Sequence, residues 1–200
     1  MPSFDLEDKY PSQKIIGIDE VGRGCLFGPV VAAAVMLNRD IFINHGIRDS
    51  KKILKPKREL LADYICKNHH FGIGIATVQE IDKFNILEAT KLAMQRAVVS
   101  ISLAIDIALI DGNMAPKLDF KTETVIKGDD LSFSIAAASI VAKVTRDNLI
   151  CNLAQIYPNY FLEKNMGYGT ANHIASIYKY GITDMHRKSF NPVRLILDKD

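Results

Sequence analysis

The chain has 200 residues, 48% of them hydrophobic, and a formal net charge of +2 at neutral pH. This length and apolar content are enough to bury the core of one domain. A net charge so close to zero excludes a uniformly basic nucleic-acid binder. Cys25, Cys66 and Cys151 lack the spacing of a disulfide framework or a zinc site, which fits a reducing compartment.

Nothing in the sequence indicates a signal peptide or a membrane span. The first eleven residues carry acids and no apolar core of signal-peptide length. No apolar run approaches the roughly 18 residues that a membrane span requires. We therefore expect a cytoplasmic protein without membrane contact.

Apolar runs and helical periods alternate along the chain. The expected elements are strands at 15–19 and 30–37, a helix at 56–68, a strand at 71–78, a helix at 86–101, strands at 104–111 and 122–127, a long helix at 132–157 and a helix at 170–180. Pro56 suits the first turn of the first helix, and Asn85 is expected to cap the second. This order predicts an α/β fold, with a sheet flanked by helices and a small helical C-terminal extension.

The composition changes after Pro158, where Tyr, Asn, Lys and Gly become frequent, and the chain contains no internal repeat. We expect one domain over 1–200. Its core should cover about 12–160, and a helical segment from about 161 to 200 should pack on that core.

Acidic residues follow two of the expected strands and precede the long helix. Asp19 and Glu20 end the first apolar run, Asp111 ends the run at 104–111, and Asp129 comes shortly before the helix. Open α/β sheets gather their sites at strand ends, so these carboxylates are expected to meet. Neighbouring carboxylates repel one another unless a cation compensates, and oxygen ligands suit Mg²⁺ or Mn²⁺ rather than zinc. The pattern predicts a divalent-metal site.

Each acid taken alone also has a structural explanation. Asp19 and Glu20 can end a strand at the surface, Asp-Gly at 111–112 is a common turn, and Asp129 or Asp130 can favour a helix N-terminus electrostatically. Successive strand residues also point to opposite faces. Asp19 and Glu20 therefore cannot both direct side chains at one ion unless the strand bulges, or Glu20 acts through its backbone carbonyl or a water.

Positive charge is concentrated between Arg48 and Arg58, where six cations stand against one acid, Asp49. Such a patch can hold a phosphate backbone, although a solvated loop and helix start explains it equally well. On the long helix, Ser139 and Lys143 are spaced i, i+4 and share a face, from which both can contact phosphates. The alternative is a helix hydroxyl and a lysine that extends to solvent.

Several short runs stand in order along most of the chain. They cover residues 17–24, 28–35, 49–52, 111–113, 127–129, 137–147, 167–170 and 186–190. Together these runs resemble the ribonuclease HII family. The resemblance implies an RNase H-like fold with a mixed central sheet, and a single catalytic domain. It also implies a metal-dependent endonuclease that hydrolyses the RNA strand of RNA/DNA hybrids and cuts 5′ to ribonucleotides embedded in duplex DNA, as ribonucleotide excision repair requires.

By the same resemblance, the catalytic and metal-binding acids are Asp19, Glu20, Asp111 and Asp129, which would hold two Mn²⁺ or Mg²⁺ ions. Asp130 competes with Asp129, but the distance back from the run at 137–139 favours Asp129. One ion would activate the attacking water and the other would stabilise the departing 3′ oxygen, giving a 3′-hydroxyl and a 5′-phosphate.

The expected substrate-binding residues are Gly22, Arg23, Gly24, Lys51, Ser139, Lys143 and Tyr168. Glycine lets a backbone approach a sugar, and the 2′-hydroxyl distinguishes RNA from DNA. By resemblance, the glycine turn and Tyr168 sense the ribonucleotide together. His186 lies in a run that carries the resemblance, and we expect it to order the C-terminal segment. Met166 and Cys25 depart from the family pattern, which commonly has lysine and proline at these positions.

Three rival interpretations remain open. Ribonuclease HIII usually carries an additional N-terminal platform and lacks the arginine of the glycine turn. A dinucleotide-binding protein would use Gly22, Gly24 and Gly28, but the spacing differs and a strand follows where a helix is required. A non-catalytic nucleic-acid binder has no need to gather carboxylates near phosphates.

The expected partner is nucleic acid, either an RNA/DNA hybrid or DNA that contains ribonucleotides. We expect the protein to be a monomer. A sliding-clamp contact would suit such an enzyme, but no terminal motif in the sequence indicates one.

Overall fold

The computed structural model describes residues 1–198. At its centre lies a mixed sheet, whose strands follow the order β3-β2-β1-β4-β5 within these residues. The strands are β1 (Ile15–Val21), β2 (Val30–Met36), β3 (His70–Ala76), β4 (Ile107–Asp111) and β5 (Lys121–Val125). The first three pair antiparallel, whereas β4 and β5 run parallel to β1. The predicted α/β fold with a mixed sheet is confirmed.

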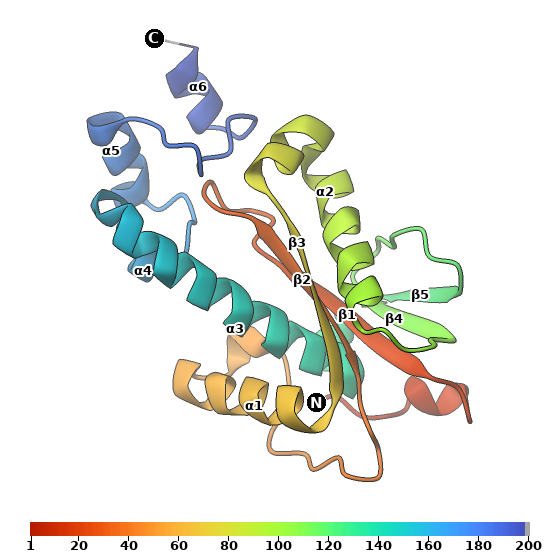
Figure 1. Ribbon diagram of the computed structural model, residues 1–200. Helices are drawn as coiled ribbons and strands as arrows, with labels where there is room; N and C mark the ends of the chain where they lie inside the picture. Colours follow the sequence, from red (N-terminus) through yellow and green to blue (C-terminus); the bar gives the residue numbers. More distant parts are fainter. Residues whose placement is uncertain (199–200) are drawn as a thin grey trace.

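Helices cover both faces of the sheet (Figure 1). The α-helices are α1 (Lys55–Asn68), α2 (Val78–Ser100), α3 (Phe133–Ile156), α4 (Leu162–Asn165), α5 (Ala171–Tyr180) and α6 (Val193–Leu197), and short 3-10 turns are η1 (Glu7–Lys9), η2 (Ser50–Lys52), η3 (Gly128–Asp130) and η4 (Pro158–Tyr160). One core cluster joins β1 and β2 to α2, and a second joins the opposite face to α1 and α3. No helix within residues 1–198 has the length and apolar character that crossing a membrane would require.

The alternation along β1 determines which face carries the acidic residues. Ile16 and Ile18 pack in the cluster on the α2 side. Gly17 faces α3, where a Cβ would overlap the backbone of Ser134, so glycine is required for α3 to lie this close to the strand. Asp19, two residues further, therefore points to the α3 side.

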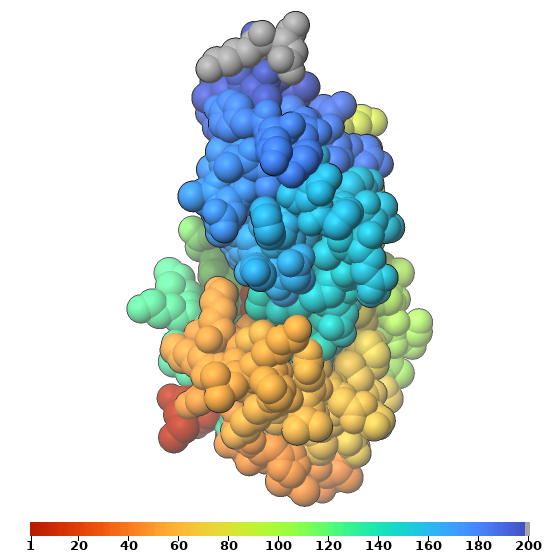
Figure 2. Space-filling model, turned by 90° about the vertical axis from the view of Figure 1, so that its left-hand side faces the viewer, coloured from red at the N-terminus to blue at the C-terminus, as the bar shows by residue number. Residues whose placement is uncertain are grey.

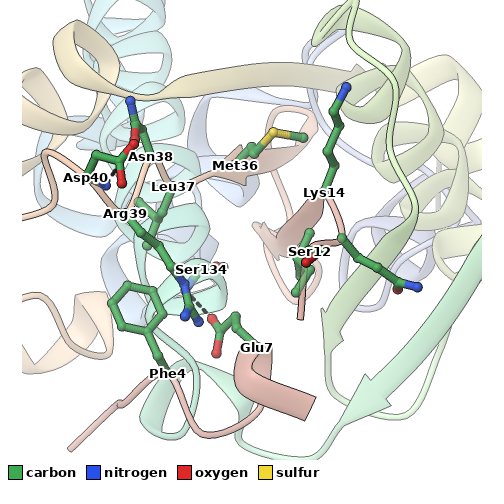
Figure 3. Close-up of a pocket in the computed structure, with 12 residues that line it drawn as sticks. Phe4, Glu7, Ser12, Lys14, Met36, Leu37, Asn38, Arg39, Asp40 and Ser134 are labelled. Carbon is green, nitrogen blue, oxygen red and sulfur yellow. Dashed lines mark hydrogen bonds between the residues drawn. The ribbon is translucent and has the colours of Figure 1, made fainter. Parts of the chain in front are cut away.

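The start of α3 is held by the N-terminal segment. Ser132 caps the helix by accepting a hydrogen bond from the Ile135 amide at 3.1 Å. The buried Glu7 carboxylate accepts from the Ser132 hydroxyl at 2.7 Å. It also accepts from the Ser134 amide at 3.0 Å (Figure 3). An acidic side chain at this position also complements the helix dipole, so residues far apart in sequence fix where α3 begins.

The predicted order of strands and helices is confirmed, with small shifts at the boundaries. The largest difference is α2, which is kinked at Asn85 (φ 71°). Asn85 accepts from the Leu87 and Glu88 amides and so caps the second part of α2, as predicted. The first part begins at a capping box formed by Thr77 and Glu80, a signal that the strand prediction for 71–78 obscured.

The C-terminal segment packs against the end of the sheet and α3 through an apolar cluster. Phe27 and Ile150 meet Leu162, Ile177 and Val193 there. Figure 2 shows this segment in blue beside the cyan surface of α3. The predicted domain extends to residue 200, and its last two residues lie outside the described part of the chain.

Candidate active site

The ends of two parallel strands bring Asp19 and Asp111 together. β1 and β4 are in register up to the pair Ile18 and Ile110, so the two aspartates follow side by side, on strands about 4.8 Å apart. Leu109 packs against the α3 side of the sheet, which places Asp111 on the same face as Asp19. The predicted convergence at the strand ends is therefore present for these two residues.

Asp129 reaches the same place from the turn before α3. The Gly128 amide donates to Asp111 Oδ1 at 2.7 Å, which fastens η3 to the end of β4. The Asp111 charge acts on Asp129 strongly enough to contribute to its raised pKa. Three acids from separate parts of the sequence thus meet at one edge of the sheet.

The side chain of Glu20 leaves β1 in a different direction from that of Asp19. The pairing of β1 with β2 continues without a bulge through Glu20 and Val21, so Glu20 and Asp19 point to opposite faces. The Glu20 carboxylate lies 3.3 Å from Arg23. The sequence had left open a bulge that would align both side chains, and the structure has none there.

Burial and mutual repulsion make these carboxylates unusual. Burial, then the charges of Glu20 and Asp111, raise the pKa of Asp19 well above its ordinary value, and hydrogen bonds from Ser139 and the Glu20 amide oppose this. Burial also raises the pKa of Glu20, although Arg23 lowers it. Burial and the charge of Asp111 raise the pKa of Asp129 to about 6. Such groups gain from a bound cation or proton.

Asp130 has the opposite character. Its carboxylate lies 2.6 Å from the Lys52 ammonium, which lowers the pKa of Asp130. Lys52 also lies 3.6 Å from Asp49, so this lysine bridges η2 and η3. Of the two adjacent aspartates, Asp130 is ion-paired and Asp129 has a raised pKa, and the choice of Asp129 as the metal ligand stays a prediction.

The adjacent aspartates support a pH prediction for the metal-free protein. The pKa of Asp129 in the folded state, about 6, exceeds the ordinary value of 3.8, so the free energy of unfolding falls as the pH rises from about 4 to 6, and the full penalty is present above pH 6. Asp129→Asn should therefore be more stable than the wild type at pH 7.5 in EDTA, by about 1 kcal/mol after solvent screening. The difference should shrink as the pH falls through 6 and vanish only at about pH 3.5, below the ordinary pKa of 3.8. Urea unfolding at both pH values measures it, and Asp130→Asn, which removes an ion pair, should show no such stabilisation at pH 7.5.

A cavity of about 210 Å³ opens beside the acids. Its lining includes Asp19, Glu20, Lys51, Ser139, Lys143 and Tyr168. Four of the predicted substrate-binding side chains therefore share one cavity with two of the predicted acids. Gly22, Arg23 and Gly24 continue from Val21, which also lines it.

Neighbouring side chains hold two polar residues of this cavity, Ser139 and Lys143, and one of these neighbours, Ser50, also lines it. The Ser139 hydroxyl lies 2.8 Å from that of Ser50, which comes from the basic segment at 48–58. Lys143 donates to Asp147 at 2.7 Å, and Asp147 lies 3.5 Å from Arg58. The sequence assigned no role to Ser50, although it lies within the run at 49–52 that carries the resemblance.

Two fully buried arginines hold the glycine turn, and sequence reasoning missed both. Arg146 donates to the carbonyls of Pro29 (3.0 Å), Phe27 (3.1 Å) and Met166 (2.8 Å). At Gly22, whose φ is +96°, a Cβ would overlap the Arg146 side chain. The positive φ and the overlap with Arg146 together explain why position 22 requires glycine.

Arg187 provides the second support. It donates to the carbonyls of Gly22 and Arg23, each at 2.7 Å, and to that of Gly28 at 2.9 and 3.0 Å. Both arginines occur in runs that carry the resemblance. From the sequence alone, however, an arginine that is buried and donates only to carbonyls cannot be told from an arginine that binds phosphates.

The donor set fits hard divalent cations. Asp19, whose pKa is raised and which forms no ion pair within residues 1–198, and Asp111 offer carboxylate oxygens at the strand ends, the ligands that Mg²⁺ and Mn²⁺ prefer. Within residues 1–198, no three aspartate, glutamate, histidine or cysteine side chains are grouped closely enough to hold one metal ion by themselves. Mg²⁺ commonly takes only one or two carboxylates and completes its shell with water and substrate phosphates.

A larger cavity, of about 500 Å³, lies at the opposite end of β1 (Figure 3). Lys14 and Ile15 line it, together with Glu7 and Arg39. None of the predicted acids or substrate-binding residues belongs to its lining. The smaller cavity is therefore the candidate active site, because its lining contains predicted acids and predicted substrate-binding residues.

Comparison with known proteins agrees with this arrangement. The family model for ribonuclease HII matches residues 16–193. Ribonuclease HII of Wolbachia sp. subsp. Brugia malayi is 52% identical over 96% of this chain and 94% of its own length. That of Rickettsia africae is 52% identical over 92% of this chain and 95% of its own.

Solved structures show the same fold. The RNase HII of Archaeoglobus fulgidus, determined in complex with PCNA, superposes with a TM-score of 0.74 at 25% identity, over 89% of this chain and 95% of that one. Bst-RNase HIII, determined in complex with Mn²⁺, gives 0.79 at 18% identity, and this chain covers 74% of it. Because the family model and the relatives of about 50% identity agree, the chain belongs to the ribonuclease HII family of metal-dependent endoribonucleases, with an RNase H-like fold.

Proposed function

We propose that this protein, as a cytoplasmic monomer with one catalytic domain, cuts the RNA strand of RNA/DNA hybrids and also nicks duplex DNA on the 5′ side of single embedded ribonucleotides. The observation that carries the proposal is the meeting of Asp19, Asp111 and Asp129 beside a cavity lined by Lys51 and Tyr168. Carboxylates close to phosphates would weaken the binding of a nucleic acid, so acids next to a lysine suit metal-dependent cleavage of a phosphodiester better than nucleic-acid binding without cleavage.

Asp19, Glu20, Asp111 and Asp129 are proposed to hold two divalent cations, Mn²⁺ or Mg²⁺. When bound, such ions lower the pKa of the attacking water and stabilise charge on the departing 3′ oxygen. Asp19 and Asp111 contribute from one face of the sheet, whereas Glu20 leaves β1 on the opposite face and, although it lines the same cavity, is proposed to contribute through its backbone carbonyl or a water. The expected products are a 3′-hydroxyl and a 5′-phosphate.

Lys51, Ser139 and Lys143 are proposed to hold the phosphates of the cut strand. All three line the cavity, and Ser139 and Lys143 share one face of α3. Asp147 orients the Lys143 ammonium at 2.7 Å. These contacts position the backbone and carry no sequence information, which suits an enzyme that acts on any sequence.

Recognition of the ribose is assigned to the turn at 22–24 and to Tyr168. The turn exposes backbone groups next to the acids. Apart from its two chain neighbours, no atom of residues 1–198 lies within 4 Å of where a Cβ of Gly24 would be, which leaves room for a sugar. The Tyr168 side chain is 41% exposed and lines the same cavity. A 2′-hydroxyl can donate and accept hydrogen bonds and is absent from DNA.

Incubation with a labelled duplex that carries one ribonucleotide tests the function. The protein should nick this duplex in Mg²⁺ or Mn²⁺, and EDTA should abolish the nick. An all-DNA duplex of the same sequence should remain intact. Binding without a metal-dependent nick would instead favour a non-catalytic nucleic-acid binder, and a 2′,3′-cyclic phosphate would exclude attack by water.

Replacing Tyr168 by alanine tests the ribose assignment. Cleavage at a single ribonucleotide should fall by at least about 10-fold, which corresponds to the loss of one good contact in the transition state. Because the ring is partly exposed, the melting temperature should change little. Tyr178→Ala, a change at a tyrosine that is 62% exposed on α5, is the matched control. Wild-type kcat/KM in the Tyr168 variant would contradict the assignment.

A further inference from the structure

Two adjacent residues of the C-terminal segment reach both sides of the proposed ribose-binding site. His186 and Arg187 are completely buried. Arg187 donates to the carbonyls of Gly22 and Arg23 in the glycine turn. His186 reaches Tyr168, on the other side, through a second buried histidine, His173.

The hydrogen bonds determine the tautomers of the two histidines. His173 Nδ1 lies 2.8 Å from the Tyr168 carbonyl oxygen, which can only accept, so Nδ1 carries the proton. His173 Nε2 then accepts from His186 Nε2, 3.2 Å away. His186 Nδ1 accepts from the Thr183 amide at 3.1 Å. All four ring nitrogens therefore have partners when both rings are neutral.

The surroundings keep both rings neutral. The rings of Phe27 and Tyr160 lie 5.0 and 4.9 Å from that of His186. Burial lowers the pKa of His173, and burial with the neighbouring His173 lowers the pKa of His186 to about 3, against a small opposing effect of Asp184. A proton added to His173 Nε2 would also face the N–H of His186 Nε2, so the hydrogen bond between the two rings would be lost.

The backbone of Tyr168 is held on both sides. Its amide donates to the Asn165 carbonyl at 2.9 Å, and the Gly167 carbonyl accepts from the Leu26 amide at 2.8 Å. His173 holds the carbonyl of Tyr168 itself. With the backbone fixed, the side chain leaves in one direction, toward the cavity that contains Asp19.

We propose that His186 and Arg187 are positioning residues that couple the glycine turn to Tyr168, so that the two groups that sense the ribose keep a fixed separation. His173 transmits the contact from His186 to Tyr168. This inference rests on the proposed function, because it assigns a purpose to the spacing of those groups. It gives the C-terminal segment a role in substrate discrimination and not only in folding.

A double-mutant cycle tests the coupling. His186→Leu keeps the side-chain bulk, removes the contact to His173 and should lower kcat/KM for a single-ribonucleotide duplex about 10-fold. In the Tyr168→Ala background, the same change should have no further effect, since the residue through which it acts is gone. Losses that multiply would overturn the proposal, as would wild-type activity in His186→Leu.

Two further variants separate positioning from folding. His186→Gln keeps a distal N–H donor toward His173 and should restore most of the activity. Tyr160→Phe removes a hydroxyl beside the same histidine that, within residues 1–198, bonds only to the carbonyls of Tyr180 and Gly181 (2.9 Å), and it leaves the backbone of Tyr160 in place. It should lower the melting temperature and leave kcat/KM unchanged. If His186→Leu fails to fold, His173→Gln, which loses the donor to the Tyr168 carbonyl, replaces it in the cycle.

A measurement without substrate distinguishes failure of the inference from failure of the function. In protein labelled with 3-fluorotyrosine, the ¹⁹F resonance of Tyr168 is identified by its loss in Tyr168→Phe. His186→Leu should shift this resonance, and His186→Gln should restore it. A wild-type protein that cuts no ribonucleotide duplex would refute the proposed function, whereas an unshifted resonance would refute the positioning role whatever the activity.

Discussion

Replacement of Asp111 by asparagine is expected to lower metal-dependent cleavage by about 10³-fold or more, without loss of stability in EDTA. Asparagine keeps the Oδ1 atom that accepts from the Gly128 amide at 2.7 Å, so the junction between β4 and η3 should survive. It removes the charge that contributes to the raised pKa values of Asp19, Glu20 and Asp129. The metal-free variant should therefore melt at the same temperature as the wild type or higher.

Asp106→Asn is the matched control for this substitution. Asp106 immediately precedes β4, and its carboxylate accepts from the Lys14 amide at 2.7 Å, so the change again keeps an acceptor and removes a charge. Cleavage should be unaffected. Thermal unfolding with and without Mn²⁺ completes the comparison, because an ion that binds the folded state raises the melting temperature. A fall of more than about 5 °C for Asp111→Asn in EDTA would instead show a structural role.

Arg146→Leu is expected to have the largest effect on stability, a loss of about 3 kcal/mol or more in the free energy of unfolding. The substitution removes the guanidinium donor from the carbonyls of Phe27, Pro29 and Met166 at a fully buried position, and Met166 keeps only a weak contact from the Cys25 thiol at 3.6 Å. Each buried unpaired group costs about 1–3 kcal/mol. Urea unfolding measures the change.

Arg194→Leu makes the same chemical change at an exposed position on α6 and should alter stability by less than about 0.5 kcal/mol. A similarly small loss for Arg146→Leu would mean that its carbonyl partners find other donors. The glycine turn and the strand that follows it would then be held by their own backbone conformation and by Arg187 alone.

The fold was largely predictable because its periodic signals are strong. The apolar run of β2 and the alanine-rich run of α3 are buried nearly throughout, and such runs leave few alternatives. The first part of α2 was missed because the glycine-rich run of β3 continues into Val78, the first residue of the helix. The capping box that starts α2 depends on Thr77 and Glu80, two side chains that periodicity does not register.

The candidate site was predictable in its residue types more than in its geometry. Acids at the ends of strands and before α3 predicted that Asp19, Asp111 and Asp129 would meet. The direction of Glu20 could not be predicted, because it depends on whether β1 bulges, and the register is continuous. Likewise, the contrast between Asp129 and Asp130 depends on Lys52, which lies about 80 residues away in the sequence and 2.6 Å away in space.

The contacts of the N-terminal segment with the start of α3 connect the N-terminus to the region of Asp129. Ser3 exchanges backbone hydrogen bonds with Leu131 and Phe133, and Glu7 holds Ser132 and Ser134, all directly after Asp129. Purification tags or deletions that disturb the first nine residues should therefore shift the start of α3 and, with it, Asp129, a proposed metal ligand. Preparations that differ only at this end would differ in apparent ion affinity although every ligand is intact.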